Sequence, residues 1–252
     1  AIERVRAVIS NAYGFERNFE VDLIVGGPPC QGYSGIGHRR SYAVEKRQLP
    51  SNRLFEPMAE LIEQVRPKAF LFENVKGILS GRWSADGEKG EIWRDVRQRF
   101  QAIDGYSTNW QLVQAKDYNV PQNRPRVLLV GIREDIAISA GLEVGHGNGT
   151  AIKSGHLPDA LENAAPDLVD LLSDLVDPSI EEALKTQAFP KQFHNNTYAF
   201  EPMTDIQRGL RTKPDGSLLG KGDILTDQEY SKHKEAVVAK FQFMISYGGQ
   251  IA

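Results

Sequence analysis

Four short apolar runs divide the first half of the chain, and turn-forming or charged residues bound each of them. They cover residues 21–25, 69–72, 106–113 and 127–130, and only the third alternates apolar with polar side chains. Continuous runs of this length predict buried strands, whereas alternation predicts a strand with one exposed face. We therefore expect four strands, the fourth ending at Gly131.

Apolar residues at helical spacing lie between and beyond these runs. Pro57 has to occupy the first turn of one such helix, where proline is tolerated, and Pro67 stops it. Strands that alternate with helices indicate an α/β sheet. The pattern predicts helices within residues 2–9, 54–65, 92–100, 168–175 and 224–247.

The character of the chain changes near residue 150. Residues 1–150 hold the strands, and residues 151–252 are mixed helical and irregular, with residues 189–222 expected to be irregular throughout. Residues 145–149 are rich in glycine but lack the Lys-Ser or Lys-Thr of a phosphate-binding loop, so they predict a flexible connection. Residues 159–182 contain acidic side chains without Lys or Arg and predict a solvated surface.

Composition narrows the classes of protein. The chain has 252 residues, of which 40% are hydrophobic and 25% charged, as in ordinary soluble domains. No apolar run approaches the roughly 18 residues of a membrane span, so no membrane association is expected. The single cysteine excludes an internal disulfide or a cysteine-cluster zinc site, and the five histidines lack metal-ligand spacing. A reducing, cytoplasmic or nucleoid setting fits this composition.

The one cysteine lies where the strand pattern predicts chemistry. Cys30 follows the first predicted strand, after Gly26-Gly27-Pro28-Pro29, and ligand chemistry in open α/β sheets gathers at the carboxyl ends of strands. Each proline fixes its own φ and restricts the residue before it, so the platform under Cys30 is stiff. A free cysteine is more often a small buried hydrophobe, and composition alone favours that interpretation.

Four motifs in order carry a family resemblance. Pro29-Cys30-Gln31 is followed by Asn52-Arg53-Leu54, by Glu73-Asn74-Val75 and by Gln122-Asn123-Arg124-Pro125-Arg126. This series resembles the cytosine-5 DNA methyltransferase family, closely over residues 21–131 and loosely beyond. The resemblance implies a Rossmann-like sheet of the S-adenosylmethionine-dependent methyltransferases, with helices on both faces, here in partial form. Residues 1–150 would be the catalytic core, and residues 151–252 would lead toward a target-recognition region.

The resemblance also implies catalytic roles. Cys30 would add to carbon 6 of cytosine, which makes carbon 5 nucleophilic, and thiolate is the reactive form of cysteine. Glu73, expected directly after a buried strand, would act as a buried, protonated carboxyl at ring nitrogen 3. Arg126 would contact the base oxygen O2, and Arg124 would contact phosphate or the catalytic loop.

Cofactor and DNA contacts follow from the same family. The methyl donor would be S-adenosylmethionine, in a pocket lined by Pro29, Asn52 and Leu54. The substrate would be double-stranded DNA with the target cytosine flipped out of the helix. The loop of residues 34–52 would close over the base, and the residues expected to contact DNA are Gln31, Ser34, Arg39, Arg40 and Gln122.

The sequence also departs from the family. The first glycine motif, the acidic residue for the cofactor ribose, the closing asparagine motif and a clear recognition domain are missing, and Asn119 stands where glycine is usual. We therefore expect a partial chain or half of a split enzyme, with weak cofactor binding by itself and a second polypeptide as partner. Two alternatives stay open: a catalytically silent DNA-binding or scaffold subunit, and a tRNA cytosine-5 methyltransferase.

Overall fold

The computed structural model describes residues 2–13, 20–29, 53–84, 86–162, 165–178, 196–228 and 233–246. The chain divides into two compact units, Ala1–Ala165 and Pro166–Ala252. The sequence predicts a change near residue 150, whereas the first unit of the structure ends at Ala165. Residues 151–165 therefore belong to the first unit.

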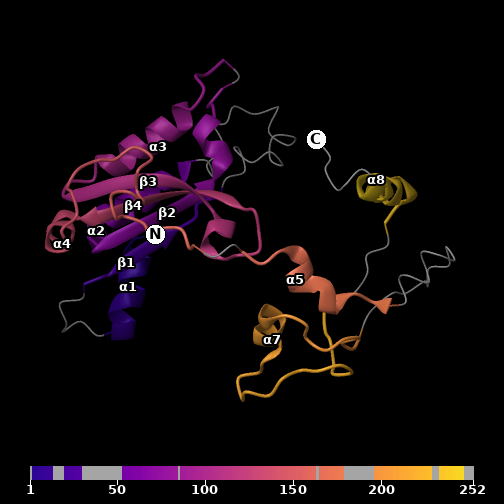
Figure 1. The fold of residues 1–252 in the computed structure, drawn as a ribbon. Coiled ribbons are helices and arrows are strands. Elements are labelled where there is room, and N and C mark those ends of the chain that lie inside the picture. The colour runs from indigo at the N-terminus through magenta and orange to yellow at the C-terminus, as the bar shows by residue number, and fades with distance from the viewer. Residues whose placement is uncertain are drawn as a thin grey trace. The chain divides into compact units, whose positions relative to one another are not determined.

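A four-stranded mixed sheet forms the centre of the first unit (Figure 1). Its strands lie in the order β1 (Leu23–Gly26), β2 (Ala69–Val75), β4 (Pro125–Arg133) and β3 (Tyr106–Gln114). β1 pairs parallel to β2, and the other two pairs are antiparallel. A parallel pair needs a crossover, and α2 (Phe55–Val65) lies in the crossover from β1 to β2. The α/β class and the four predicted strands are thereby confirmed.

The helices of this unit begin and end near the predicted positions. Arg66 adopts a left-handed conformation (φ 56°) and ends α2 just before Pro67, as expected. Two short 3₁₀ helices and α4 were not predicted, because segments of four to six residues carry too little periodicity. The remaining elements are α1 (Ile2–Tyr13), η4 (Lys76–Ser80), α3 (Glu91–Gln101), η5 (Ala115–Tyr118) and α4 (Glu134–Ser139).

The main core fills the space between one face of the sheet and the helices α2 and α3. Alternate residues of β2 point into it, so that Phe70 and Phe72 are fully buried while their neighbours are not. The Phe70 ring stacks on Phe100 of α3 with a centroid distance of 5.4 Å. A Cβ on Gly131 would lie 2.0 Å from the Phe70 ring. Gly131 therefore makes room for Phe70 inside β4, and the expectation that it ends the strand is wrong.

Two sequence expectations about strand environment are also wrong. β1 lies at an edge of the sheet, and its Leu23 and Val25 side chains are 54% and 61% exposed, so β1 is not a buried strand. An apolar run cannot reveal whether a strand has one neighbour or two. β2 continues to Val75, because its pairing with β4 runs on as far as Arg126. Glu73 consequently lies within a strand instead of after one.

Residues 145–156 are bound to β3, which contradicts the flexible connection expected around residues 145–149. The Thr108 amide donates to Gly145, and the Gly147 amide donates back to the Thr108 carbonyl at 2.8 Å. His156 is buried, with its ring nitrogens 3.2 Å from the Ser107 hydroxyl and 2.9 Å from the Ser154 hydroxyl. Burial lowers the pKa of His156.

The second unit contains α5 (Leu168–Leu172), η6 (Ser173–Leu175), α7 (Asp205–Arg211) and α8 (Glu235–Ser246). α7 falls where irregular structure was expected, and its signal was the capping box of Thr204 and Gln207. Within the acidic stretch, Asp174 is buried and binds Arg211 at 2.6 Å, so a solvated surface is the wrong expectation for that residue. The Arg211 guanidinium also stacks on the Tyr198 ring.

We predict that the stability of the first unit falls as the pH drops below about 6.5, the ordinary pKa of histidine. His156 has a lower pKa in the folded state, so the folded protein binds fewer protons than the unfolded chain. The contribution of His156 to stability is therefore fully present above this pH and is lost as the pH falls through the folded pKa. His156→Gln should weaken this dependence in urea unfolding compared at pH 7.5 and 5.5. His146→Gln, at an exposed histidine, is the control. Equal pH dependence in His156→Gln and the unchanged protein would contradict the assignment.

Candidate functional site

Glu73 and Arg126 meet on the face of the sheet opposite the main core. Val75 pairs directly with Arg126, and Glu73 pairs with Leu128, so the two charged residues are diagonal neighbours on adjacent strands. Arg126 Nε lies 2.5 Å from Glu73 Oε1, and their side chains are 18% and 37% exposed. The contact is a close ion pair, but the Arg126 Nε–H is not aligned for a hydrogen bond to the carboxylate. Arg126 Nη1 donates a hydrogen bond to the Pro125 carbonyl at 2.8 Å. The expectation that Glu73 is buried is wrong.

The Glu73 carboxylate also lies over the backbone that follows β1. A Cβ built on Gly27 would lie 3.0 Å from Glu73 Oε2, so any residue other than glycine at this position would displace the carboxylate. Gly27 stands three residues before Cys30 in the sequence. The acid of the candidate site is thus adjacent to the segment that leads to the cysteine.

Asn74 attaches the same segment from the other face of β2. Its side chain is 3% exposed, and its Nδ2 donates to the carbonyl oxygen of Pro28 at 3.2 Å. The Asn74 Oδ1 accepts from the Val75 amide at 3.0 Å. Glu73 and Asn74, consecutive residues on opposite faces of one strand, therefore both contact residues 27–28.

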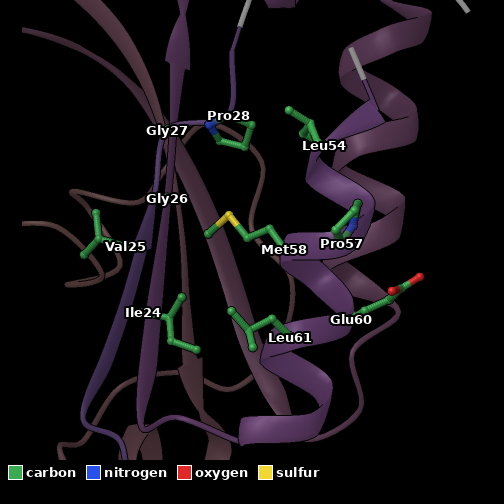
Figure 2. A pocket seen from close by; sticks show the side chains of 10 residues that line it. All are labelled: Ile24, Val25, Gly26, Gly27, Pro28, Leu54, Pro57, Met58, Glu60 and Leu61. Carbon is green, nitrogen blue, oxygen red and sulfur yellow. The ribbon is translucent and has the colours of Figure 1, made fainter. Parts of the chain in front are cut away.

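A pocket of about 560 Å³ opens between the end of β1 and the first turns of α2. Figure 2 shows Ile24, Met58 and Leu61 pointing into the space between strand and helix, while Val25 points to the other side. A Cβ on Gly26 would lie 2.6 Å from Met58 Sδ, so Gly26 lets the methionine approach the strand. The lining is apolar except for Glu60, and it consists of Ile24, Val25, Gly26, Gly27, Pro28, Leu54, Pro57, Met58, Glu60 and Leu61.

The structure brings together only part of the predicted site. Glu73 pairs with Arg126, and Leu54, predicted to bind the cofactor, lines the pocket. Pro29 is exposed, and its neighbour Pro28 lines the pocket instead. Arg124 and Gln122 are exposed in the turn before β4 and do not take part in the Glu73–Arg126 ion pair. The predicted residues outside the described part of the chain are Cys30, Gln31, Ser34, Arg39, Arg40 and Asn52.

Sequence reasoning missed three residues that shape this region. Gly27 and Met58 matter through close approach, which sequence does not encode. Asn74 carried a usable signal, because period-two alternation from Phe70 and Phe72 places this amide on the inward face of the strand. A buried amide needs hydrogen-bond partners, so its position predicts a structural attachment.

Within the described residues, no cluster of His, Cys, Asp and Glu has the arrangement of a metal site. None of the described helices has the length and apolar character needed to cross a bilayer.

Known proteins similar to this chain are named as methyltransferases. The orphan methyltransferase M.SPRI of Bacillus phage SPR is 38% identical over 117 residues, covering 46% of this chain and 24% of that protein. The type II methyltransferase M.Bpa9945I of Bacillus paralicheniformis is 34% identical over 140 residues, covering 51% and 29%. The type II methyltransferase M.FnuDI of Fusobacterium nucleatum is 39% identical over 118 residues, covering 47% and 31%. The chain thus spans about a quarter to a third of these relatives.

A prophage-encoded E. coli protein, described as a DNA modification methyltransferase, is a solved structure similar to this chain. It is 23% identical, covers 70% of this chain and 41% of its own, and superposes with a TM-score of 0.46. The model of the family C-5 cytosine-specific DNA methylase matches residues 9–244, which is most of the sequence. The chain therefore belongs to the C-5 cytosine-specific DNA methylase family.

Proposed function

We propose that this chain carries the base-binding and nucleophilic part of a DNA cytosine-5 methyltransferase, with Cys30, Glu73, Arg126 and Arg124 as its catalytic residues. The observation that carries the proposal is the Glu73–Arg126 pair next to Gly27, the start of the segment that leads to Cys30. A silent scaffold subunit would have no use for an acid and a guanidinium placed together beside this segment.

The proposed chemistry begins with addition of the Cys30 thiolate to carbon 6 of the cytosine ring. The electron pair of the carbon 5–carbon 6 double bond moves into the ring and makes carbon 5 nucleophilic. When bound, S-adenosylmethionine would supply an electrophilic methyl group for carbon 5, with S-adenosylhomocysteine as the leaving group. Loss of the carbon 5 proton to a base then expels the thiolate and restores the aromatic ring.

Glu73 and Arg126 fit the polar edge of cytosine. That edge presents the O2 acceptor, the N3 acceptor and the exocyclic amino donor in sequence. Arg126 would donate to O2, while Glu73 would accept from the amino group and, when protonated, donate to N3. Partly exposed ion pairs contribute about 0–1 kcal/mol, so a base can replace the contact between the two side chains at low cost. Arg124 would contact the DNA backbone or the catalytic loop, because guanidinium suits phosphate.

The pocket between β1 and α2 is the proposed place for S-adenosylmethionine. Its volume lies in the range of about 300–1,000 Å³ that small-molecule sites usually have, and Leu54 lies in its lining. Glu60 is the charged side chain of the lining and suits the cationic groups of this cofactor. Pro29 and Asn52 stay predictions for the same pocket.

Double-stranded DNA in a bacterial cell is the proposed substrate, with the target base flipped out. Gln31, Ser34, Arg39, Arg40 and Gln122 stay the proposed contacts to it. We also propose that a second polypeptide completes the cofactor site. In support, β1 lies at a sheet edge with Leu23 and Val25 exposed, beside the pocket that β1 itself lines.

The nucleophile is tested with duplex DNA that contains 5-fluorocytosine, because fluorine at carbon 5 cannot leave as a cation and the adduct persists. We predict a protein–DNA adduct at Cys30 by mass spectrometry in millimolar S-adenosylmethionine, and none with Cys30→Ser. Cys30 is the only cysteine, so the substitution removes every thiol. An adduct that survives it would show that another residue attacks the base.

Gly27→Ala tests the position of the acid. The new methyl group meets the end of the flexible Glu73 side chain, so the carboxylate moves while the fold loses little stability. We expect adduct formation to slow about tenfold, as misplaced catalytic groups do. Gly209→Ala is the matched control, because a Cβ there meets no atom within 4 Å. Equal adduct rates in the two variants would argue against a role for the Glu73 position.

The pocket is tested through the methyl group of Met58, observed by NMR in protein labelled at methionine methyl carbons. S-adenosylmethionine at millimolar concentration should shift the Met58 signal and leave that of Met203 in the second unit unchanged. We expect the dependence of the Met58 shift on the S-adenosylmethionine concentration to indicate weak binding by this chain alone. Tight stoichiometric binding in isothermal titration, or equal shifts at Met58 and Met203, would contradict the proposal.

A further inference from the structure

We propose that Asn74 is a positioning residue for the nucleophile, which it serves through the carbonyl of Pro28. This inference rests on the proposed function, because it concerns how Cys30 is held relative to Glu73 and Arg126. Asn74 touches none of the reacting atoms in this proposal. It acts through the backbone that leads to the cysteine.

Residues 28 and 29 have few ways to be anchored. Neither proline has an amide hydrogen, so this part of the segment cannot donate a backbone hydrogen bond. Its carbonyl oxygens are the backbone groups that remain, and the Asn74 amide donates to that of Pro28 at 3.2 Å.

The anchor provided by Asn74 is itself rigid. Asn74 is 3% exposed, and its Oδ1 is held by the Val75 amide, which fixes the orientation of the side-chain amide. The residue lies in β2 on the core side, paired through the backbone with Val127 of β4. The donor therefore belongs to the same two strands that carry Glu73 and Arg126.

The constraint on Pro28 extends along the backbone toward the cysteine. The hydrogen bond orients the planar peptide that joins Pro28 to Pro29, and the ring of Pro29 fixes its φ. Between this anchored peptide and the Cys30 thiol, the rotatable torsions are the ψ of Pro29 and the φ and χ1 of Cys30. One side-chain hydrogen bond thus limits where the thiol can lie relative to the Glu73–Arg126 pair.

Asn74→Asp is the informative substitution, because it keeps the shape and the acceptor for Val75 but removes the donor to Pro28. With the carboxyl ionised, we expect the rate of adduct formation on 5-fluorocytosine DNA to fall about 10- to 100-fold at saturating DNA. DNA affinity should stay within about twofold, since phosphate contacts dominate it. Lowering the pH from 8 to 6 should reduce the difference in adduct rate between Asn74→Asp and the unchanged protein, because a protonated carboxyl at position 74 can again donate to the Pro28 carbonyl.

Asn109→Asp is the matched control. Asn109 is also 3% exposed, its Oδ1 also accepts from the next amide, and its Nδ2 donates to Thr150 and Ser154 on residues distant in sequence from the candidate site. It should lose stability in urea unfolding to a similar degree while its adduct rate is unchanged. Asn74→Ser, whose hydroxyl is too short to reach Pro28, should lose the rate without any recovery at low pH, and it replaces Asn74→Asp should that variant fail to fold.

Equal adduct rates in Asn74→Asp and Asn109→Asp, or rate losses proportional to stability losses in both, would overturn the inference. Alkylation of Cys30 by iodoacetamide separates this failure from failure of the proposed function. Should the unchanged protein form no adduct, the proposed function fails. The positioning role still predicts an alkylation rate that changes at least threefold in Asn74→Asp and stays constant in Asn109→Asp.

Discussion

The antiparallel pairing of β2 with β4 is the constraint on which the candidate site depends. This register places Val75 opposite Arg126 and Glu73 opposite Leu128, which brings an acid and a guanidinium together on one face. A shift by one residue would turn every side chain to the other face of the sheet. It would bury the Glu73 carboxylate among aromatic rings and expose Phe70 and Phe72. Core packing and site geometry are therefore selected by the same pairing.

The end of β2 serves both faces of the sheet at once. Phe70, Phe72 and Asn74 point to the core, and Glu73 between them points to the opposite side. Asn74 binds the carbonyl of Pro28, and Glu73 lies against Gly27. The segment after β1 is thus attached from two directions to a strand whose own position is fixed by buried aromatic side chains.

The pattern of apolar and polar residues predicted the strands and longer helices of the first unit, because continuous apolar runs, alternation and helical spacing each indicate a different element. It failed for Gly131, which lies inside β4 because the Phe70 ring fills the space of its absent side chain. It also failed for β1, since the run of residues 21–25 is apolar apart from Asp22 although β1 lies at an edge. These errors share a cause: the neighbours that decide them are distant in sequence.

For the candidate site, motif resemblance predicted Glu73, Arg126 and Leu54, but the surroundings of these residues depend on the three-dimensional fold. The half-exposed state of Glu73 and its contact with Arg126 depend on strand register. Gly27 and Met58 act through close approach of backbone and side chain, for which a single sequence has no signal. The attachment made by Asn74 could be predicted, because a buried amide at an inward position of a strand requires hydrogen-bond partners.

In the proposed function, this chain holds the groups that activate cytosine, independently of the methyl donor. Release of tritium from DNA labelled at carbon 5 of cytosine measures this step without S-adenosylmethionine, because thiolate addition at carbon 6 allows the proton on carbon 5 to exchange with water. We predict that the chain alone releases tritium, that Cys30→Ser abolishes the release, and that Glu73→Gln slows it. A folded chain that releases no tritium, or whose release is unaffected by Cys30→Ser, would contradict it.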